Sequence, residues 1–476
     1  MTTIFDLPSV SPTARRDDLS PAIPGLEPAL ARRKALRVPT LAEPQIARHY
    51  TKLSRMNYGV DDGLYPLGSC TMKYNPKLHE QLVAMPEFAD VHPGTPPRLA
   101  QGTLAALHRM SVLLAAIAGL PAVTLQPSAG AHGELTGMFL MKRFFETRGE
   151  KERNTIILTD SAHGTNPASA ALAGFRVLEL KSLSDGTVDV DALTNVLDEH
   201  TAGIMLTVPN TLGLFEPRIR EVTARVHEAG GLCYFDGANL NSYIGRARPG
   251  DMGADVFHFN LHKTLSTPHG GGGPGSGPVA VAEHLEPFLP VPRIDFDGER
   301  YGLDWSPDQT IGSVHPYFGN VGVILKAFAY LLRLGDQGLA EVSAYACLHA
   351  NYLQHRLKDV YKLPYDRLCK HEFVLSGEGV AEGVTTTDIA KRLIDFGFHP
   401  PTVYFPLIVH QALMIEPTET ETKESLDAFA DAMVAIAKEA ANHPERLHEA
   451  PISTPVRRLD QTQAAREPIL RHPFET

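Results

Sequence analysis

The stretch LCYFDGANLNSYIGRARPGDMGADVFHFNLHKT, residues 232–264, decides the fold. It contains two short apolar runs, at 232–235 and 256–259, and each run is followed by one chemically distinctive residue. Asp236 comes directly after the first run, and Lys263 lies four residues beyond the second. Such runs predict buried strands of a mostly parallel sheet. Because ligands of these sheets bind at the carboxyl ends of the strands, Asp236 and Lys263 mark a candidate site.

Three earlier apolar runs repeat this pattern. They are TIIL at 155–158, VLEL at 177–180 and IMLTV at 204–208, and helical patterns at 190–200 and 219–229 lie between several of the runs. Short buried strands that alternate with helices predict an α/β fold, in which a mostly parallel sheet has helices on both faces. The residues that follow each run are therefore the place to look for function.

Changes in composition divide the chain into three expected regions. Residues 1–95 form an N-terminal extended arm and helices, since the first fifty residues carry seven prolines. Residues 96–320 form the large α/β domain, and residues 321–476 form a small C-terminal α+β domain and tail. In this last region we expect helices at 321–334, 342–360, 387–396 and 423–440, and apolar strand-like runs at 372–375 and 403–409.

Composition narrows the class of protein. The chain has 476 residues, with 44 Lys and Arg against 55 Asp and Glu, a net charge of −11 that argues against nucleic-acid binding. Its longest apolar stretch, 112–125, is interrupted by Gly119 and Pro121 and is shorter than the ~20 residues of a membrane span. We therefore expect no membrane association. With no secretory signal in the first thirty residues, we expect a cytoplasmic protein.

The cysteines give no sign of a metal site. Four cysteines are widely spaced and form no CxxC pair: Cys70, Cys233, Cys347 and Cys369. We expect free thiols in a reducing compartment and no bound metal.

A third motif, SAGAHGE at 128–134, follows the apolar run VTLQP and precedes a helical pattern. Small residues at such a turn leave backbone N–H groups free to bind phosphate at the helix N-terminus. Each motif alone has an ordinary alternative: a tight turn here, a helix-capping acid at Asp236, a surface charge at Lys263. Together, in this order, they are typical of pyridoxal-phosphate (PLP) enzymes, which need a lysine, an acid for the pyridine nitrogen and phosphate donors.

At this point the sequence resembles the glycine decarboxylase P-protein of the glycine cleavage system, specifically its separate second subunit. The matching stretches cover most of residues 50–280: MNYGVDDGLYPLGSCTMKYNP (56–76), QPSAGAHGE (126–134), DSAHGTNPASA (160–170), PNTLGLFE (209–216), YFDGANLN (234–241) and DMGADVFHFNLHKTLSTPHGGGGPGSGP (251–278). The resemblance implies the PLP-dependent transferase fold of the aspartate-aminotransferase type, which has a mostly parallel sheet of about seven strands and a smaller C-terminal α+β domain, with the large domain binding PLP.

The resemblance also implies roles for individual residues around the cofactor. They are covalent attachment at Lys263, pairing with the pyridinium nitrogen at Asp236, ring packing by Ala238 and His132 on opposite faces, phosphate binding by Gly130 and Ala131, and contact with the 3-hydroxyl at Asn210. His262 and Lys263 are the expected groups for proton transfer. His163, Thr165 and Asn166 are expected to line the glycine site, although a helix cap before Pro167 explains them as well.

The implied reaction is decarboxylation of glycine with transfer of the aminomethyl group to the lipoyl arm of the H-protein. The chain has half the length of the long family form and keeps the lysine-bearing half, which implies a homologous first subunit and a heterotetramer with two copies of each. Two alternatives stay open: another PLP enzyme of this fold, such as a cysteine desulfurase or an aminotransferase, and a non-catalytic scaffold subunit. A scaffold has no use for the Asp236–Lys263 pair.

Overall fold

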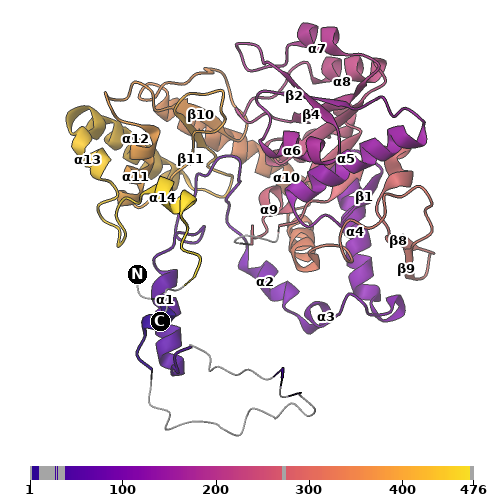
Figure 1. Cartoon of the computed structure of the whole chain (residues 1–476), viewed down its shortest axis with the longest axis horizontal. Coiled ribbons are helices and arrows are strands. Elements are labelled where there is room, and N and C mark those ends of the chain that lie inside the picture. Colours follow the sequence, from indigo (N-terminus) through magenta and orange to yellow (C-terminus); the bar gives the residue numbers. More distant parts are fainter. Residues whose placement is uncertain (1–2, 10–26, 28, 31–37, 271–274, 472–476) are drawn as a thin grey trace. The chain divides into compact units, whose positions relative to one another are not determined.

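The computed structural model describes residues 3–9, 27, 29–30, 38–270 and 275–471 (Figure 1). It divides into two compact units. The first comprises residues 1–59 and 454–476, and the second comprises residues 60–453. This division differs from the expected boundaries, because residues 60–95 belong with the sheet-bearing unit and residues 454–476 with the N-terminal one.

The first unit is small and mainly helical. Its elements are η1 (Ile4–Asp6), α1 (Glu43–Ser54) and α14 (Gln461–Arg466). A proline at the start of α1 pre-organises its first turn, and the Gln45 side chain donates a hydrogen bond to the Pro8 carbonyl (3.0 Å). Most of the proline-rich arm expected over the first fifty residues lies outside the described residues.

The second unit is built on a seven-stranded sheet with the order β1-β7-β6-β5-β4-β2-β3. The strands are β1 (Ala122–Thr124), β2 (Thr155–Thr159), β3 (Arg176–Leu180), β4 (Thr201–Thr207), β5 (Leu232–Gly237), β6 (Val256–Phe259) and β7 (Val279–Val281). Strands β2 to β6 pair in parallel, whereas β7 is antiparallel to both β1 and β6. The predicted fold class and the five predicted strands are confirmed.

Successive strand residues enter two separate cores, one on each face of the sheet. In β5, Cys233 and Phe235 pack into one core, while Leu232 and Tyr234 pack into the other. The expected burial on both faces is therefore confirmed. The surrounding helices are α4 (Gln101–Ala118), α5 (Gly130–Thr147), α6 (Thr165–Leu172), α7 (Val190–Val196), α8 (Ile219–Glu228) and the short α9 (Leu261–Thr264).

Helix α4 is the one described helix whose length and composition would allow it to cross a membrane, and buried residues make up 39% of its most apolar window. It packs against β1 and the long helix α10 (Val321–Leu357), an arrangement that the core helix of a globular protein also shows. Shorter elements complete this region: α2 (Lys77–Val83), α3 (Pro86–Ala89), η3 (Pro97–Leu99), η4 (Leu240–Ser242), η5 (Gly250–Met252), η6 (Glu283–Phe288), and the hairpin of β8 (Arg293–Phe296) and β9 (Tyr301–Asp304).

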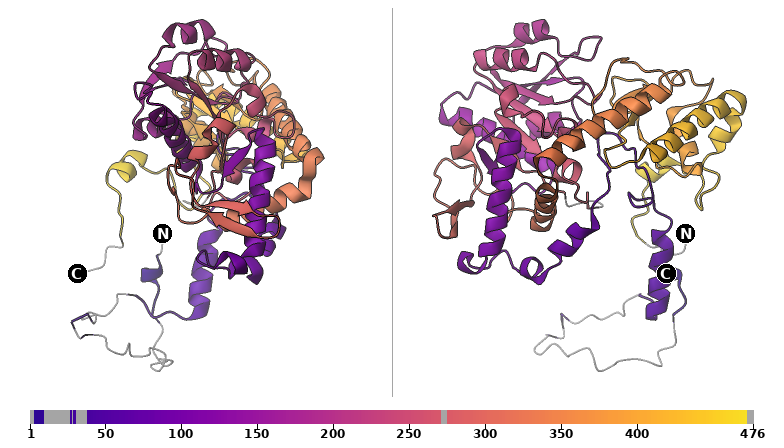
Figure 2. Two further views of the ribbon diagram at one scale, coloured as in Figure 1. Left: turned by 90° about the vertical axis from the view of Figure 1, so that its right-hand side faces the viewer. Right: turned by 180° about the vertical axis from the view of Figure 1, so that it is seen from behind.

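Helix α10, orange in Figure 2, leads from the sheet to the C-terminal elements. These are β10 (Phe373–Ser376), α11 (Thr386–Asp395), β11 (Thr402–Val403), β12 (Ala412–Ile415), α12 (Lys423–Asn442) and α13 (Pro444–Glu449), with an antiparallel sheet in the order β10-β12-β11. They form a separate hydrophobic core. The small α+β region thus agrees with the expectation in type, although it belongs to the same compact unit as the seven-stranded sheet.

The two helices expected at 321–334 and 342–360 are present as the two segments of α10, which meet at a kink where Gly335 has a non-helical conformation (φ 60°, ψ −171°). One other detail of this region differs from the sequence-based expectation. The strand expected over 403–409 is limited to β11, and the longer strand is β12. Pro406 lacks the N–H that a continuing ladder requires, which explains why the pairing stops.

Candidate active site

Asp236 and Lys263 are brought to the same edge of the sheet because β5 and β6 are parallel neighbours. Asp236 lies near the end of β5, in register with His258 of β6, and Lys263 follows β6 within α9. The charge of Lys263 is one of the groups that lower the pKa of Asp236. The Lys263 amine has no hydrogen-bond or ion-pair partner within the described residues, so it is free to react with a ligand.

Asp236 is held as a buried carboxylate. It is 2% exposed, and it accepts hydrogen bonds from the backbone N–H of Ala238 (2.9 Å) and the side-chain amide of Asn166 (3.0 Å). His258 Nε2 lies 3.3 Å from the same carboxylate. Burial alone would raise the pKa of Asp236, but His258, Asn166 and Lys263 together lower it below its ordinary value. The group is therefore a fixed negative charge.

Asn166 is a hydrogen-bond partner of the Asp236 carboxylate and does not line an open substrate site. Its side chain is fully buried; its amide nitrogen donates to Asp236, and its amide oxygen accepts from the Thr207 hydroxyl (3.4 Å). Thr165 is also engaged, since its hydroxyl donates to Glu134 (2.8 Å). All three residues expected to line the glycine site have positioning contacts, since His163 Nδ1 also lies within hydrogen-bond distance of the Thr165 hydroxyl (2.8 Å).

The third residue, His163, lies among the charged groups of the site. Burial lowers its pKa, Lys263 lowers it further, and Asp236 acts in the opposite direction. Its ring makes an edge contact with Phe405. His132, which was expected to cover the cofactor ring, lies beside His315, with the two ring centroids 6.1 Å apart, and it accepts from the Ser128 backbone N–H (3.3 Å). The geometry therefore favours His163 over His132 as the flat side chain beside Asp236 and Lys263.

The N-terminus of α5 has the features of an anion site. The backbone N–H groups of Gly130 and Ala131 have no acceptor in the described part of the chain. A Cβ on Gly130 would lie 2.1 Å from Asn260 Oδ1, and one on Gly277 would lie 2.1 Å from the Ala129 carbonyl oxygen. A Cβ is therefore excluded at Gly277 by the backbone of Ala129 and at Gly130 by the side chain of Asn260, and the helix dipole adds to the attraction for an anion.

His262 faces the same region as a neutral donor. The Ser276 backbone N–H donates to its Nδ1 (3.2 Å), so the ring proton is assigned to Nε2. Burial, with help from Lys263 and His269, lowers the pKa of His262 to about 3. Such a ring remains uncharged at neutral pH, and a hydrogen bond from Nε2 to an anion suits it better than accepting a proton, the role expected from the sequence.

Asn210 has a structural role in the turn after β4. Its amide nitrogen donates to the Gly186 carbonyl (2.9 Å), and its amide oxygen accepts from the backbone N–H groups of Leu212 and Leu214 (both 3.1 Å). These contacts hold the loop after β4 in place, and both lone pairs of the Asn210 side-chain oxygen accept a hydrogen bond. The expected contact of Asn210 with the cofactor 3-hydroxyl therefore has no support from the geometry.

A pair of buried glutamates was not predicted from the sequence. Glu372 directly precedes β10 and Glu416 directly follows β12, and the register of these strands places the two side by side. Ser69 N–H donates to Glu372 (2.8 Å), and Thr71 N–H donates to Glu416 (3.0 Å). Burial raises the pKa of Glu416, and the charge of Lys263 acts against it, so the pair belongs to the same site.

The residues present fit PLP. The cofactor brings an aldehyde, a pyridine nitrogen and a phosphate, and the site offers an unpaired amine at Lys263, a buried carboxylate at Asp236 and free N–H groups at the start of α5. The buried hydroxyl of Ser276, next to His262, has no hydrogen-bond partner among the described residues, which leaves a further donor for the phosphate.

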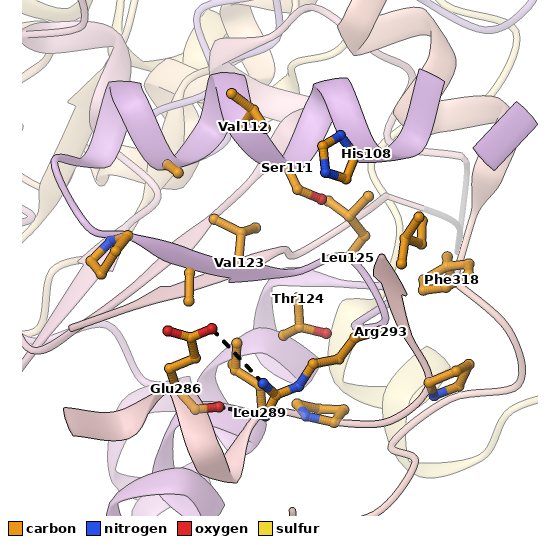
Figure 3. A pocket seen from close by; sticks show the side chains of 16 residues that line it. His108, Ser111, Val112, Val123, Thr124, Leu125, Glu286, Leu289, Arg293 and Phe318 are labelled. Atoms are coloured by element: carbon orange, nitrogen blue, oxygen red, sulfur yellow. Dashed lines mark hydrogen bonds and ion pairs between the residues drawn. The ribbon is translucent and has the colours of Figure 1, made fainter. Parts of the chain in front are cut away.

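A separate cavity of about 270 Å³ lies at the edge of the sheet, between α4, β1 and η6 (Figure 3). Arg293 extends into it and donates to the Glu286 carbonyl (2.5 Å). Neither Asp236 nor Lys263 lines this cavity, and it brings together no group that the predicted chemistry requires.

Comparisons with known proteins show the family of this chain. Residues 342–453 match the family model described as glycine dehydrogenase, C-terminal domain, and residues 137–364 match aminotransferase class-V. The probable glycine dehydrogenase (decarboxylating) subunit 2 of Caldanaerobacter subterraneus is 56% identical over 443 residues, which cover 93% of this chain and 91% of that protein. Its counterpart in Halalkalibacterium halodurans is 54% identical over 96% of this chain and 94% of that protein.

Solved structures show the same fold. A crystal structure of glycine decarboxylase (P-protein) of the glycine cleavage system, in inhibitor-bound form, has a TM-score of 0.70 at 21% identity, over 89% of this chain and 94% of that one. The glutamate decarboxylase of Lactobacillus brevis has a TM-score of 0.64 at 15% identity, over 86% and 95% of the two chains. From the identity and coverage of the curated relatives, this chain belongs to the family of glycine dehydrogenase (decarboxylating) subunit 2.

Proposed function

We propose that this chain is the PLP-bearing subunit of a glycine decarboxylase, with Lys263 as the attachment residue. The observation that carries the proposal is the unpaired Lys263 amine on α9, beside the hydrogen-bonded carboxylate of Asp236. The overall reaction breaks the bond between the α-carbon and carboxyl carbon of glycine and releases carbon dioxide. The aminomethyl carbon then bonds to one sulfur of a lipoyl disulfide on the H-protein, and the other sulfur leaves as a thiol.

Bound PLP supplies the electron sink for the bond that breaks. Asp236, kept ionised in spite of its burial, holds a proton on the pyridine nitrogen, and Asn166 and Ala238 N–H fix the orientation of its carboxylate. His163 would pack against the ring, and Ala238 would be the small residue on the opposite face. Such contacts would hold the cofactor plane in place while charge develops on it.

The phosphate would be held by neutral donors. The free N–H groups of Gly130 and Ala131, together with the Nε2–H of His262, would bind an anion without adding a full positive charge. Lys263 then carries the mobile proton of the site, because the low pKa of His262 leaves it uncharged at neutral pH. This division of roles replaces the shared proton transfer expected from the sequence.

Thiol chemistry of the desulfurase type is disfavoured by the cysteines of this chain. A catalytic thiol needs a depressed pKa, and burial raises the pKa of all four, Cys70, Cys233, Cys347 and Cys369. Desulfurase structures match this chain in fold alone, at 16–17% identity.

We also propose the assembly and location that this function requires. The curated relatives are named subunit 2, which supports a first subunit as partner, in a heterotetramer with two copies of each. The lipoylated H-protein is the transient partner, and the cytoplasm is the expected compartment. Light scattering of the co-expressed pair measures the stoichiometry directly.

Borohydride reduction of the purified protein, followed by peptide mapping, tests the assignment of Lys263. The label is expected on the peptide that contains Lys263, and glycine should shift the visible absorbance of the untreated protein. Lys263→Ala is expected to bind PLP without covalent label and to lose turnover. A label on another lysine would exclude the assignment.

A further inference from the structure

Lys73 is a buried cation that the proposed chemistry does not use. It is 2% exposed, although lysine is among the residues least often buried. Its Nζ donates to the Thr264 carbonyl (2.6 Å), the Tyr330 hydroxyl (3.2 Å) and Glu419 Oε1 (2.5 Å). An ammonium group has three N–H donors, so every one of them is used.

These three partners come from distant parts of the sequence. Thr264 is the last residue of α9, Tyr330 lies in α10, and Glu419 follows β12. Burial would disfavour the charge, but Glu419 and Tyr330 together raise the pKa of Lys73 above its ordinary value. The cation therefore joins the sheet region, the long helix and the small C-terminal region at one point.

The contact with Thr264 acts on the backbone that carries Lys263. The carbonyl at the end of a helix lacks an intrahelical donor, and a cation placed there stabilises that end. Two residues further on, the Ser266 hydroxyl donates to the Tyr74 carbonyl (2.6 Å), and Ser266 has a positive φ of 55°. Residues 73–74 thus hold residues 264–266 from one side.

The contacts of residues 73–74 with residues 264–266 are important because the Lys263 side chain has no partner of its own within the described residues. Its amine is placed by the backbone of a four-residue helix, which is too short to be rigid by itself. Lys73 and Tyr74 supply the restraint that α9 lacks.

The segment that bears Lys73, Gly68–Lys73, is itself fixed on the small C-terminal region. A Cβ on Gly68 would lie 2.6 Å from the Met414 carbonyl oxygen, and Gly68 N–H donates to that oxygen (3.2 Å). Ser69 and Thr71 have positive φ values of 65° and 47°. Their backbone N–H groups bind the glutamate pair, so the strained conformation of this segment is held by its contacts.

We propose that Lys73 is a positioning residue for the reaction: through the Thr264 carbonyl and its ion pair with Glu419, it sets the position of the Lys263 amine. This inference rests on the proposed function of Lys263. It predicts that removal of the Lys73 ammonium group slows every step in which the Lys263 amine must reach the cofactor, while glycine affinity is preserved.

Lys73→Met tests this inference in the co-expressed complex with the first subunit and H-protein. We expect kcat to fall about 10²-fold, the effect of an ångström-scale misplacement, with KM for glycine nearly unchanged. A second readout is independent of turnover: PLP is added to the cofactor-free protein, and formation of the borohydride-reducible bond at Lys263 is followed in time. This rate should fall in parallel, and Lys73→Arg should recover part of both losses.

Lys77→Met is the matched control. Lys77 forms an ion pair of the same length with Asp61 (2.5 Å), but both side chains are more than half exposed. Lys77→Met should leave both the turnover and the rate of bond formation at Lys263 unchanged. If Lys73→Met does not fold, Glu419→Gln retains the shape of the contact and should lower both rates about tenfold.

The labelling experiment distinguishes failure of the proposed function from failure of the positioning role of Lys73. If the wild-type protein carries no label at Lys263, the proposed function is wrong. If the wild-type protein is labelled and Lys73→Met or Glu419→Gln behaves as Lys77→Met does, only the positioning role is refuted.

Discussion

Replacement of Asp236 by asparagine tests the electrostatic centre of the site. The carboxylate accepts from Ala238 N–H on one oxygen and from the Asn166 amide on the other. An asparagine presents an N–H₂ group in place of one oxygen, so it must face one of these donors with a donor of its own. It also removes the negative charge that holds the ring nitrogen protonated.

The expected loss of rate follows from the hydrogen bond between the Asp236 carboxylate and the ring nitrogen, which the substitution weakens or removes. A hydrogen bond to a charged group is worth about 1.5–3 kcal/mol, and here the charge develops in the transition state. A loss of about 2–3 kcal/mol corresponds to a rate lower by about 30- to 150-fold. Cofactor binding should fall much less, because the proposed phosphate donors at Gly130 and Ala131 are unchanged.

The assay is the exchange of bicarbonate carbon into glycine, measured per bound PLP in the presence of the H-protein. Asp255→Asn is the control, since Asp255 is also a buried acid beside β6 but binds Cys233 N–H (2.7 Å) and His227 (2.8 Å). It should lower thermal stability and leave the exchange rate per bound PLP unchanged. Near-normal exchange by Asp236→Asn would refute the role assigned to the carboxylate.

Three further outcomes are expected. Gly130→Ala, whose Cβ would lie 2.1 Å from Asn260 Oδ1, should weaken PLP binding about tenfold in a fluorescence titration, whereas Gly102→Ala, with no atom within 4 Å, should not. His163→Ala should lower PLP affinity about three- to tenfold and His132→Ala less, as ring contacts are worth about 0.5–1.5 kcal/mol; the reverse order would restore His132 to the ring. The pKa of His262 is about 3 in the folded protein, against 6.5 for a free histidine. Below pH 6.5 the unfolded chain therefore binds a proton that the folded chain does not, so the contribution of His262 to stability is complete above pH 6.5 and is lost as the pH falls toward 3. Melting temperatures of the cofactor-free wild type should therefore decline over this range more steeply than those of His262→Asn, and parallel curves would contradict this.

The sequence alone was sufficient to predict the sheet and its two central residues. Short apolar runs closed by polar residues are a local signal, and parallel neighbouring strands must end at one edge, so Asp236 and Lys263 could be placed together before any coordinates. The strand expected over 403–409 was wrong because a period of apolar residues does not show where a ladder lacks a donor, as it does at Pro406.

Tertiary structure alone decided which partners surround these residues. Hydrogen bonds between residues far apart in the chain determine these partners. Asn166 binds the Asp236 carboxylate, Asn210 binds the Gly186 carbonyl, and Lys73 binds the carbonyl at the end of α9. Motif order cannot distinguish His132 from His163, since both follow strands toward the same edge. The difference arises from the directions of side chains and from long-range packing, where burial and neighbouring charges, not spacing along the chain, determine what each group can do.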